Sequence, residues 1–422
     1  MPEIKKISAI EILDSRGRPT IKAYCELDNG PSAAASVPSG ASTGAAEAHE
    51  LRDANGRFNG MGCLKAVHHI NQEINQSLKG KKINSQSDLD QHLIQLDGTP
   101  NKSNLGANAI LAVSMAFARA NAVYNNQSLY RYFATLAETN LEYLPRPTIN
   151  LFSGGKHAGG QVQVQDLLIV PTQDSIMGVL ECAYSVYQSA AKLCMEKYEM
   201  RALTADEGGL APPFINIDSM FENVIESIEN AGFVAGKDVF LAVDVAASQF
   251  YRNGKYHLGD QVLNSREMIS TLSEWVSKYP IVSLEDGLAE DDWDHWPMLK
   301  QKVGDFCVVL GDDFLCTNPE RIEKAIETDA ANALLLKVNQ IGTITEALGA
   351  LKLAKNSEWQ VTISARSGET EDHWLADLAV GWQGDNIKIG SITQSERLAK
   401  YNRLLEIEKE TNLAVGELRI NN

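Results

Sequence analysis

Residues 307–313, CVVLGDD, form a short apolar run that ends in two carboxylates, and a helical stretch, RIEKAIETDA, follows at residues 321–330. The same order of apolar strand, polar strand end and helix recurs along the second part of the chain. Serial units of this kind predict a parallel sheet, and their number favours closure into an α/β barrel over an open sheet. The other strands read VFLAVDV, IVSLED, ALLLKVN, VTISARS and IKIG.

The first part of the chain has a different texture. Alternating residues in TIKAYCEL (20–27) predict antiparallel strands, and NAILAVSM (108–115) predicts the start of a helix rich in small residues. The prolines of LPRP (144–147) indicate a boundary nearby. We therefore expect an N-terminal α+β domain over residues 1–138 and a barrel domain over residues 139–422.

Composition argues against several classes of protein. No apolar run approaches the roughly 20 residues of a membrane span, and a formal charge of −17 opposes general binding to nucleic acid or to anionic membranes. The start of the chain lacks the pattern of a signal peptide, so we expect a cytoplasmic protein. Six scattered cysteines without a Cys-x-x-Cys pair are expected to be reduced and mostly buried.

Charged side chains stand where the predicted strands end. The C-terminal strand ends of an α/β barrel share one face, and this face carries the active site of essentially all barrel enzymes. We therefore expect the charged groups at these ends to converge. They are Asp244, Glu285, Asp312, Lys337, Arg366 and Lys388.

Three carboxylates at consecutive strand ends repel one another unless a cation lies among them. Oxygen ligands without cysteine or histidine favour magnesium over zinc. Alternatively, these carboxylates only cap helices or form surface ion pairs. We would prefer that interpretation for a single aspartate, but three consecutive strand ends with a carboxylate favour a metal site. A lysine held near a divalent cation and a second lysine is prepared to act as a base, so Lys337 and Lys388 fit proton abstraction next to a carboxylate; alternatively, both only neutralise the acids.

Three loops carry weaker signals. GGKHAGG (154–160) places His157 among glycines, and ADEGG (205–209) places Glu207 in a glycine-bordered turn. SGASTG (39–44) has the small residues and hydroxyls of a lid or of a phosphate-contacting loop, although ordinary linkers share this composition.

Together these segments resemble the enolase family, whose members dehydrate 2-phosphoglycerate to phosphoenolpyruvate in glycolysis. The resemblance implies a modified TIM-like αβ barrel behind an N-terminal α+β domain. It also implies a homodimer, two Mg²⁺ ions per active site and a small phosphorylated hydroxy acid as substrate. Its segments span nearly the whole chain: DSRGRPT, VPSGASTG, LDGTPNKSNLGANAIL, SGGKHAGG, DEGGLAP, SLEDGLAEDDW, GDDFLCTNP, LLLKVNQIGT, ARSGETED and SERLAKYNRLLEIE.

Matching positions imply the parts of the site that hold metal and take the proton. Asp244, Glu285 and Asp312 would bind the tighter Mg²⁺ ion, and Ser39 would help to bind the second. Lys337 would be the base that removes the proton from C2.

The resemblance also implies how substrate binds and how the hydroxyl leaves. Lys388 would hold the substrate carboxylate, and Arg366 with Ser367 would bind its phosphate. His157 would close over the phosphate. Glu207 would be the general acid that helps the C3 hydroxyl to leave.

Two positions depart from the family pattern. Ala365 stands where the family motif SHRSGE has histidine, and Gln165-Asp166 stands where the family has Gln-Glu. Gln165 keeps its place among the substrate-binding residues, and Asp166 would act beside Glu207. A carboxylate moved by about an ångström can cost on the order of a hundredfold in rate. His373 lies beyond the strand end and is expected to pack or to face solvent.

Three hypotheses follow. The chain is a magnesium-dependent 2-phosphoglycerate dehydratase with reduced or altered activity, or a paralogue that enolises a similar acid with another outcome, such as carboxyphosphonoenolpyruvate formation. The third is a catalytically silent scaffold. We favour the first because the metal ligands and Lys337 match the family, and a silent protein would not need them.

Overall fold

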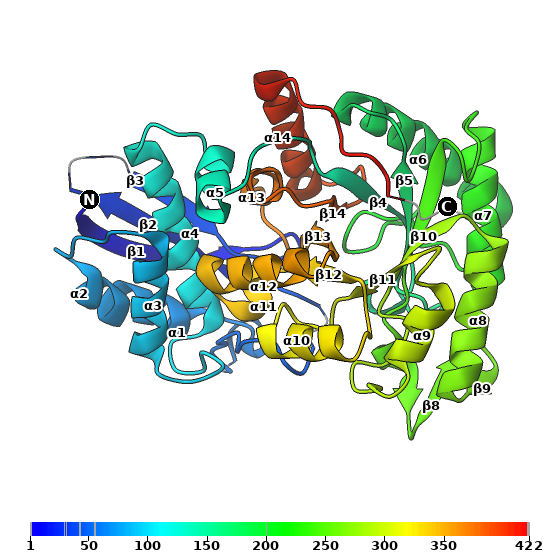
Figure 1. Ribbon diagram of the computed structural model, residues 1–422, viewed down its shortest axis with the longest axis horizontal. Helices are drawn as coiled ribbons and strands as arrows, with labels where there is room; N and C mark the ends of the chain where they lie inside the picture. Colours follow the sequence, from blue (N-terminus) through cyan, green and yellow to red (C-terminus); the bar gives the residue numbers. More distant parts are fainter. Residues whose placement is uncertain are drawn as a thin grey trace.

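The protein is described by a computed structural model that covers residues 2–28, 30, 32–41, 44–54, 56–199 and 201–419. The N-terminal elements, blue to cyan in Figure 1, lie at one end of the long axis, beside the barrel formed by the rest of the chain. The α/β barrel and the N-terminal α+β part predicted from the sequence are both confirmed. The division between residues 138 and 139 stays a prediction.

The N-terminal part is an antiparallel sheet covered by helices. The predicted strand TIKAYCEL lies in the central strand, and NAILAVSM lies in α4 (Ala107–Tyr124). Alanines and branched apolar residues bury most of α4, and their small size lets the helix pack closely on β2 and β3. The other elements are β1 (Ile4–Leu13), β2 (Pro19–Leu27), β3 (Ser32–Ser36), η1 (Arg57–Gly60), α1 (Leu64–His69), η2 (Ile70–Ile74), α2 (Asn75–Leu78), α3 (Gln86–Asp97) and α5 (Leu129–Ala137).

Eight strands close the barrel in the order β10-β11-β12-β13-β14-β4-β5-β6. The six strands predicted from the sequence are all present, and two earlier strands complete the ring. The bounds are β4 (Arg146–Ser153), β5 (Asp166–Pro171), β6 (Val239–Asp244), β10 (Ile281–Glu285), β11 (Val308–Gly311), β12 (Ala333–Leu336), β13 (Gln360–Ser364) and β14 (Asn386–Gly390).

The sheet is not wholly parallel, which corrects the expectation of a parallel sheet built from serial strand–helix units. β5 runs antiparallel to both of its neighbours, β4 and β6. A loop without a crossover helix joins β4 to β5, so the chain turns straight back. Two helices then follow, α6 (Ile176–Tyr198) and α7 (Ile217–Asn230), and such a pair returns the chain to the end where β5 stopped. The N-terminal end of β5 therefore shares a face with the C-terminal ends of the other strands.

The remaining helices surround the barrel. Side-chain caps define several of their starts; for example, Asn264 and Glu267 form a capping box at α8, and Thr343 caps α12. The elements are η3 (Gly155–His157), η4 (Ala247–Phe250), α8 (Ser265–Lys278), α9 (Trp296–Val303), α10 (Pro319–Glu327), α11 (Val338–Ile341), α12 (Ile344–Asn356), α13 (Trp374–Gly381), α14 (Ser395–Thr411) and a small sheet of β7 (Tyr251–Arg252), β8 (Lys255–Leu258) and β9 (Gln261–Leu263).

A buried carboxylate joins the N-terminal helices to the barrel. Asp90 on α3 is fully buried and accepts hydrogen bonds from Gln86 and Ser114 on one oxygen. Its other oxygen accepts from the backbone N–H and the hydroxyl of Thr345 on α12, at 2.9 and 2.6 Å. Burial raises the pKa of Asp90 to about 6.

Two expectations about composition are met within the described residues. All six cysteines are buried and none is paired with another, as expected. In the described part of the chain, every helix is too short or too polar to cross a bilayer.

Candidate active site

The face at the C-terminal strand ends holds buried charges from strands distant in sequence. Asp244 is the last residue of β6 and Glu285 the last of β10, and both are at most 3% exposed. Lys388 on β14 donates to Asp244 Oδ2 at 2.8 Å and to both oxygens of Glu285 at 2.7 and 2.9 Å. One ammonium thus bridges two of the three predicted metal ligands.

The third predicted ligand faces the other lysine. Asp312 follows β11, and its Oδ2 accepts a very short hydrogen bond from Lys337, which follows β12. Its Oδ1 accepts from Gln340 at 2.8 Å. The convergence expected for these strand ends is therefore seen in two ion-paired groups, and Arg366 lies close enough to influence the charge of Lys337.

The pKa values of Asp244 and Glu285 shift in opposite directions because both carboxylates share the single ammonium of Lys388. Burial raises the pKa of Asp244, but the charge of Lys388 and its hydrogen bond outweigh burial and lower it. Burial and the charge of Asp244 raise the pKa of Glu285 well above its usual range. One ammonium cannot fully balance two carboxylates, so one holds its charge while the other resists ionisation.

Lys337 is paired directly with a carboxylate. Burial lowers its pKa, but the charges of Asp312 and Glu285 outweigh burial, so the pKa is raised above its usual value. The carboxylate in direct contact decides this sign. The opposite shift, expected for a lysine beside a bound divalent cation and a second lysine, stays a prediction.

The donor set fits a hard divalent cation. Asp244, Glu285 and Asp312 bring three carboxylates against the two ammonium groups of Lys337 and Lys388; Lys337 is partly buried, and the other four residues are buried. Formal charge therefore stays negative, and the ligand atoms are oxygens only, which is the chemistry that Mg²⁺ prefers.

Two further acids belong to this region and were missed by sequence reasoning. Asp286 follows Glu285 and accepts the backbone N–H groups of Asp312 and Asp313 at 2.9 and 2.8 Å. Ligand atoms of these three aspartates lie within 4.8 Å of one another, a grouping that could hold a metal ion. Burial and the charge of Asp312 raise the pKa of Asp313 to about 7. The doubled acids in SLED and GDD were the available signal.

The predicted phosphate-binding residues follow β13. Arg366 is buried and contacts Glu47 through both terminal nitrogens, at 3.1 and 3.2 Å. Ser367 Oγ accepts the backbone N–H of Ala41 at 2.6 Å and an N–H of Arg16 at 3.2 Å. The segment after β3 therefore lies against both residues. Glu47 was missed from the sequence, because an acid on a surface loop gives no signal of its partner.

Ser39 lies on the same segment but faces different groups. Its hydroxyl donates to Glu50 at 3.2 Å and accepts from Arg52 at 2.8 Å, while its backbone pairs with Gly368. Among the described residues, no hydrogen bond joins it to Asp312 or the other predicted ligands. The lid predicted for residues 39–44 includes Ser42 and Thr43, which lie outside the described residues.

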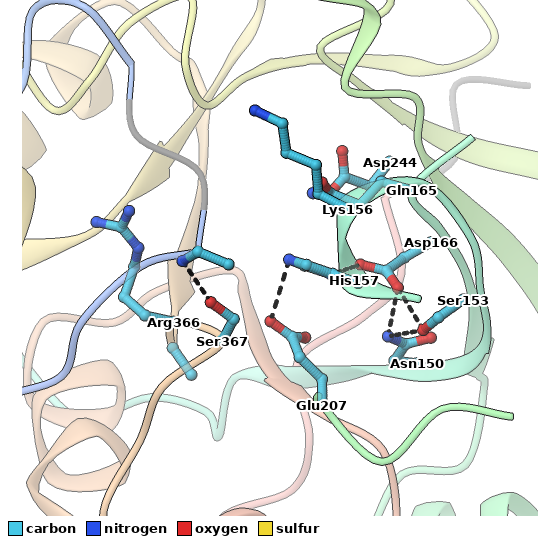
Figure 2. A network of polar contacts seen from close by, with 12 residues as sticks. Asn150, Ser153, Lys156, His157, Gln165, Asp166, Glu207, Asp244, Arg366 and Ser367 are labelled. Atoms are coloured by element: carbon cyan, nitrogen blue, oxygen red, sulfur yellow. Dashed lines mark hydrogen bonds and ion pairs between the residues drawn. The ribbon is translucent and has the colours of Figure 1, made fainter. Parts of the chain in front are cut away.

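A histidine lies between two carboxylates beside these charges (Figure 2). His157 Nδ1 is 2.6 Å from Asp166 Oδ2, and its Nε2 is 4.0 Å from Glu207 Oε1. Burial lowers the pKa of His157, but the charges of Asp166 and Glu207 outweigh burial and raise it to about 9. Burial raises the pKa of Asp166, opposed by His157. The two carboxylates therefore favour the charged, imidazolium form of the ring.

Asp166 is held from its neighbouring strand. Its Oδ1 accepts from Asn150 Nδ2 at 2.6 Å and from the hydroxyl of Ser153 at 2.7 Å, both on β4 (Figure 2). Gly209 approaches this cluster so closely that a Cβ there would lie 2.7 Å from Asn150 Oδ1. The lack of a side chain at Gly209 thus allows the turn to pack on the cluster.

The other predicted residues fall as follows. Gln165 donates to Asp244 Oδ2 at 3.1 Å and accepts from Gln249. Ala365 is 5% exposed, and its N–H donates to the Lys388 carbonyl at 2.8 Å. His373 precedes α13 with its side chain 48% exposed and 3.5 Å from Asp377, so the expectation of a surface histidine is confirmed.

The chain forms a closed αβ barrel with acids and lysines at the C-terminal ends of its strands, which is where barrel enzymes carry their active sites. Family models for the enolase N-terminal domain and the enolase C-terminal TIM barrel domain match residues 4–133 and 141–416. The chain belongs to the enolase family, which places it among the lyases of the enolase superfamily. Members of this family typically use Mg²⁺.

Proposed function

We propose that the protein is a magnesium-dependent lyase that removes the C2 proton of 2-phosphoglycerate and expels the C3 hydroxyl to give phosphoenolpyruvate. One observation carries this proposal. The buried acids Asp244, Glu285 and Asp312 meet Lys337 and Lys388 at one face of the barrel.

Each group has a task in this reaction. Asp244, Glu285 and Asp312 would hold a magnesium ion and Ser39 would help to hold a second, and the bound ions would supply positive charge that makes the C2 proton more acidic. Lys337 accepts that proton at Nζ. Before Lys337 can accept that proton, Nζ must lose one of its own, because it is now an ammonium group that donates a hydrogen bond to Asp312.

The remaining residues bind and orient the substrate. Lys388 Nζ provides an ammonium for the substrate carboxylate. Gln165 lies close to it, because both side chains donate a hydrogen bond to Asp244 Oδ2. Arg366 and Ser367 bind the phosphate, because a guanidinium presents paired N–H donors to an anion. Phosphate must compete with Glu47 for those donors.

A second reaction outcome is kept because the structure at two positions favours it. Asp166 accepts hydrogen bonds from Asn150, Ser153 and His157, and the Ala365 side chain has no proton to donate. Both positions belong to the elimination half of the proposed reaction. A paralogue that enolises a phosphoglycerate-like acid and ends in another product, such as a carboxyphosphonoenolpyruvate, would keep the residues around Lys337 and change these two.

Incubation with Mg²⁺ and 2-phosphoglycerate in deuterated water tests the proposal. Exchange at C2 with formation of phosphoenolpyruvate supports the dehydratase. Exchange without product favours the second outcome, and the absence of both reactions favours a catalytically silent scaffold.

The proposal extends to the setting of the reaction. We place it in glycolysis, in the cytoplasm and in a homodimer, and we divide the chain into domains 1–138 and 139–422. The family matches, which lie on either side of this division, support it.

A further inference from the structure

The segment after α14 lies across the barrel end opposite to the charged strand ends, which we call the lower end. Figure 1 shows this segment, residues 412–419, in red where it leaves α14 and runs toward β4 and β5, and we call it the strap. Its Leu418 packs against an apolar cluster of Leu168 and Val170 on β5, Ala242 on β6 and Val282 on β10. Because β5 is antiparallel, its last residues and the first residues of β10 meet at this lower end.

Backbone hydrogen bonds join the strap to the start of β4 and to the loop after β5. Val415 forms a parallel bridge with Leu144, just before β4. The N–H of Gly416 donates to the Leu144 carbonyl at 2.9 Å, and the N–H of Val415 donates to the Asp174 carbonyl at 2.8 Å. A Cβ at Gly416 would lie 2.9 Å from Cδ2 of Tyr143, so this close approach favours a residue without a side chain. The strap is therefore paired with the barrel like a short strand.

A buried guanidinium fixes the strap at the same place. Arg146 on β4 is 3% exposed and donates to the carbonyls of Pro171, Gln173 and Gly416 at 2.5, 3.1 and 2.7 Å. Its Nε has no hydrogen-bond partner among the described residues. A buried cation costs free energy unless its donors are satisfied, and the Gly416 carbonyl is one of the groups that offset this cost. Arg146 therefore favours the position in which the strap covers the lower end of the barrel.

A small cavity lies inside the barrel between the strap and the ion pairs of Lys388. Its volume of about 30 Å³ has room for about two water molecules. Leu418 and Arg419 line one end of it, and Glu285 and Lys388 line the other. Water would find hydrogen-bond partners in this cavity, so the lower end must be closed if bulk water is to stay out. Further polar lining comes from Thr148, Ser283, Gln360, Thr362 and Asn386.

We propose that the strap is a stopper, in which Leu418 closes the lower end of the barrel and keeps bulk water and small solutes out of the cavity beneath Lys388. Leu418 suits this task because its four neighbours on β5, β6 and β10 are apolar and offer water no hydrogen bonds. The attraction between Lys388 and its two carboxylates is stronger where water is excluded. The stopper acts at the end of the barrel away from the proposed reaction and does not depend on it.

A thiol placed behind Leu418 measures closure directly. Val170→Cys adds this thiol to the cavity wall, and its labelling by methyl methanethiosulfonate in the full-length protein is followed by mass spectrometry of peptides. Labelling should be slow while Leu418 is present. Leu418→Ala should speed it by at least about tenfold, because the reagent no longer waits for the strap to open. Leu418→Met keeps the bulk of the side chain and should stay within about threefold of the parent.

Two controls separate closure from unfolding. Glu417→Ala removes an exposed side chain from the same strap and should leave labelling at position 170 unchanged. Cys25 is fully buried on β2 in the N-terminal sheet, so its labelling reports opening of the chain as a whole and should be equal in all variants. An equal rise at position 25 and position 170 in Leu418→Ala would show a general loss of stability and overturn the stopper.

The contact of Arg146 with the strap is tested in the same assay. Arg146→Lys keeps the charge but loses the planar set of donors, so labelling at position 170 and deuterium exchange in the peptide 412–419 should both become faster. Arg131→Lys, at an exposed position, should change neither. Unchanged rates in Arg146→Lys would overturn its role in holding the strap.

The result for Leu418 decides the stopper itself. Fast labelling of position 170 with Leu418 in place, or slow labelling in Leu418→Ala, would overturn it. Labelling needs neither metal nor substrate, so this result stands whether or not 2-phosphoglycerate is dehydrated.

Discussion

The ammonium of Lys388 lies 2.8 Å from Oδ2 of Asp244, although 144 residues separate them in the chain. Barrel closure makes this contact, because β14 pairs with β4, β4 with β5, and β5 with β6. The side chains then meet inside the ring. This charge pair therefore depends on the pairing of β14 with β4, which brings the last strand of the chain beside the earlier ones.

Asp244→Asn should weaken Mg²⁺ binding by roughly tenfold or more, because affinity for such ions depends on the charge of the ligands. Isothermal titration of the purified protein with MgCl₂ measures the change. Asp291→Asn, at an exposed position, is the control and should bind like the wild type. Equal affinities for the two variants would remove Asp244 from the metal site.

Lys337→Met should lower the rate of C2 exchange by at least about a hundredfold, because it removes the group that accepts the proton. Exchange is followed by NMR in deuterated water with 2-phosphoglycerate. Lys352→Met, on the exposed side of α12, should leave the rate unchanged. Thermal unfolding checks that the loss of the Lys337–Asp312 pair has not unfolded the variant. Persistent exchange in a folded variant would contradict the role of Lys337 as base.

Ala365→His should raise the rate of dehydration relative to C2 exchange, because it adds an imidazole near the departing hydroxyl. Ala365→Leu adds bulk at the same buried position without a proton donor and controls for packing. The ratio of phosphoenolpyruvate formed to deuterium incorporated is the measurement. A ratio that stays the same or falls in Ala365→His would count against the dehydratase and in favour of another product.

Glu47→Gln should strengthen binding of inorganic phosphate roughly tenfold, or about 1.4 kcal/mol. The wild-type carboxylate occupies both terminal nitrogens of Arg366, and a neutral amide competes less well for them. Calorimetry with phosphate measures the change, and Glu371→Gln at an exposed position serves as control. Unchanged affinity would show that Glu47 and phosphate do not compete for Arg366.

Asp90 should give the protein a pH-dependent stability. Its folded pKa of about 6 lies above the unfolded value of 3.8, so its contribution is complete below pH 3.8 and is lost as pH rises through 6. Two pKa units correspond to about 3 kcal/mol.

In Asp90→Asn this loss should be absent, so the difference in unfolding free energy between variant and wild type should change between pH 4 and 6. Urea unfolding across this range measures it. Asp88→Asn, exposed on the same helix, should run parallel to the wild type. A constant difference for Asp90→Asn would show that Asp90 titrates normally.

Much of the site could be predicted because parallel strands in a barrel all end at one face. Charged residues such as Asp244, Glu285 and Lys388 are visible in the sequence at the ends of apolar runs, so their meeting follows from topology alone. The partners within the ion pairs could not be predicted from the sequence. Whether Asp312 turns toward Lys337 or toward Asp244 depends on side-chain geometry that strand spacing does not encode.

The direction of β5 could not be read in the same way. Residues 167–171 are apolar and the whole strand from Asp166 is buried, and such a run looks alike in a parallel or an antiparallel strand. Only the loop and the helix pair around it decide its direction. Partners such as Asn150, Ser153 and Glu47 were missed for a related reason, since each is defined by a contact across the fold.

The reversal of β5 places three of the site residues on a single hairpin. The hairpin of β4 and β5 alone supplies His157, Gln165 and Asp166, whereas Lys337 and most of the acids come from strands that are joined through helices. The hairpin is joined to the acids through the hydrogen bond from Gln165 to Asp244 Oδ2. An insertion or deletion in this one loop would therefore displace His157, Gln165 and Asp166 together relative to Asp244.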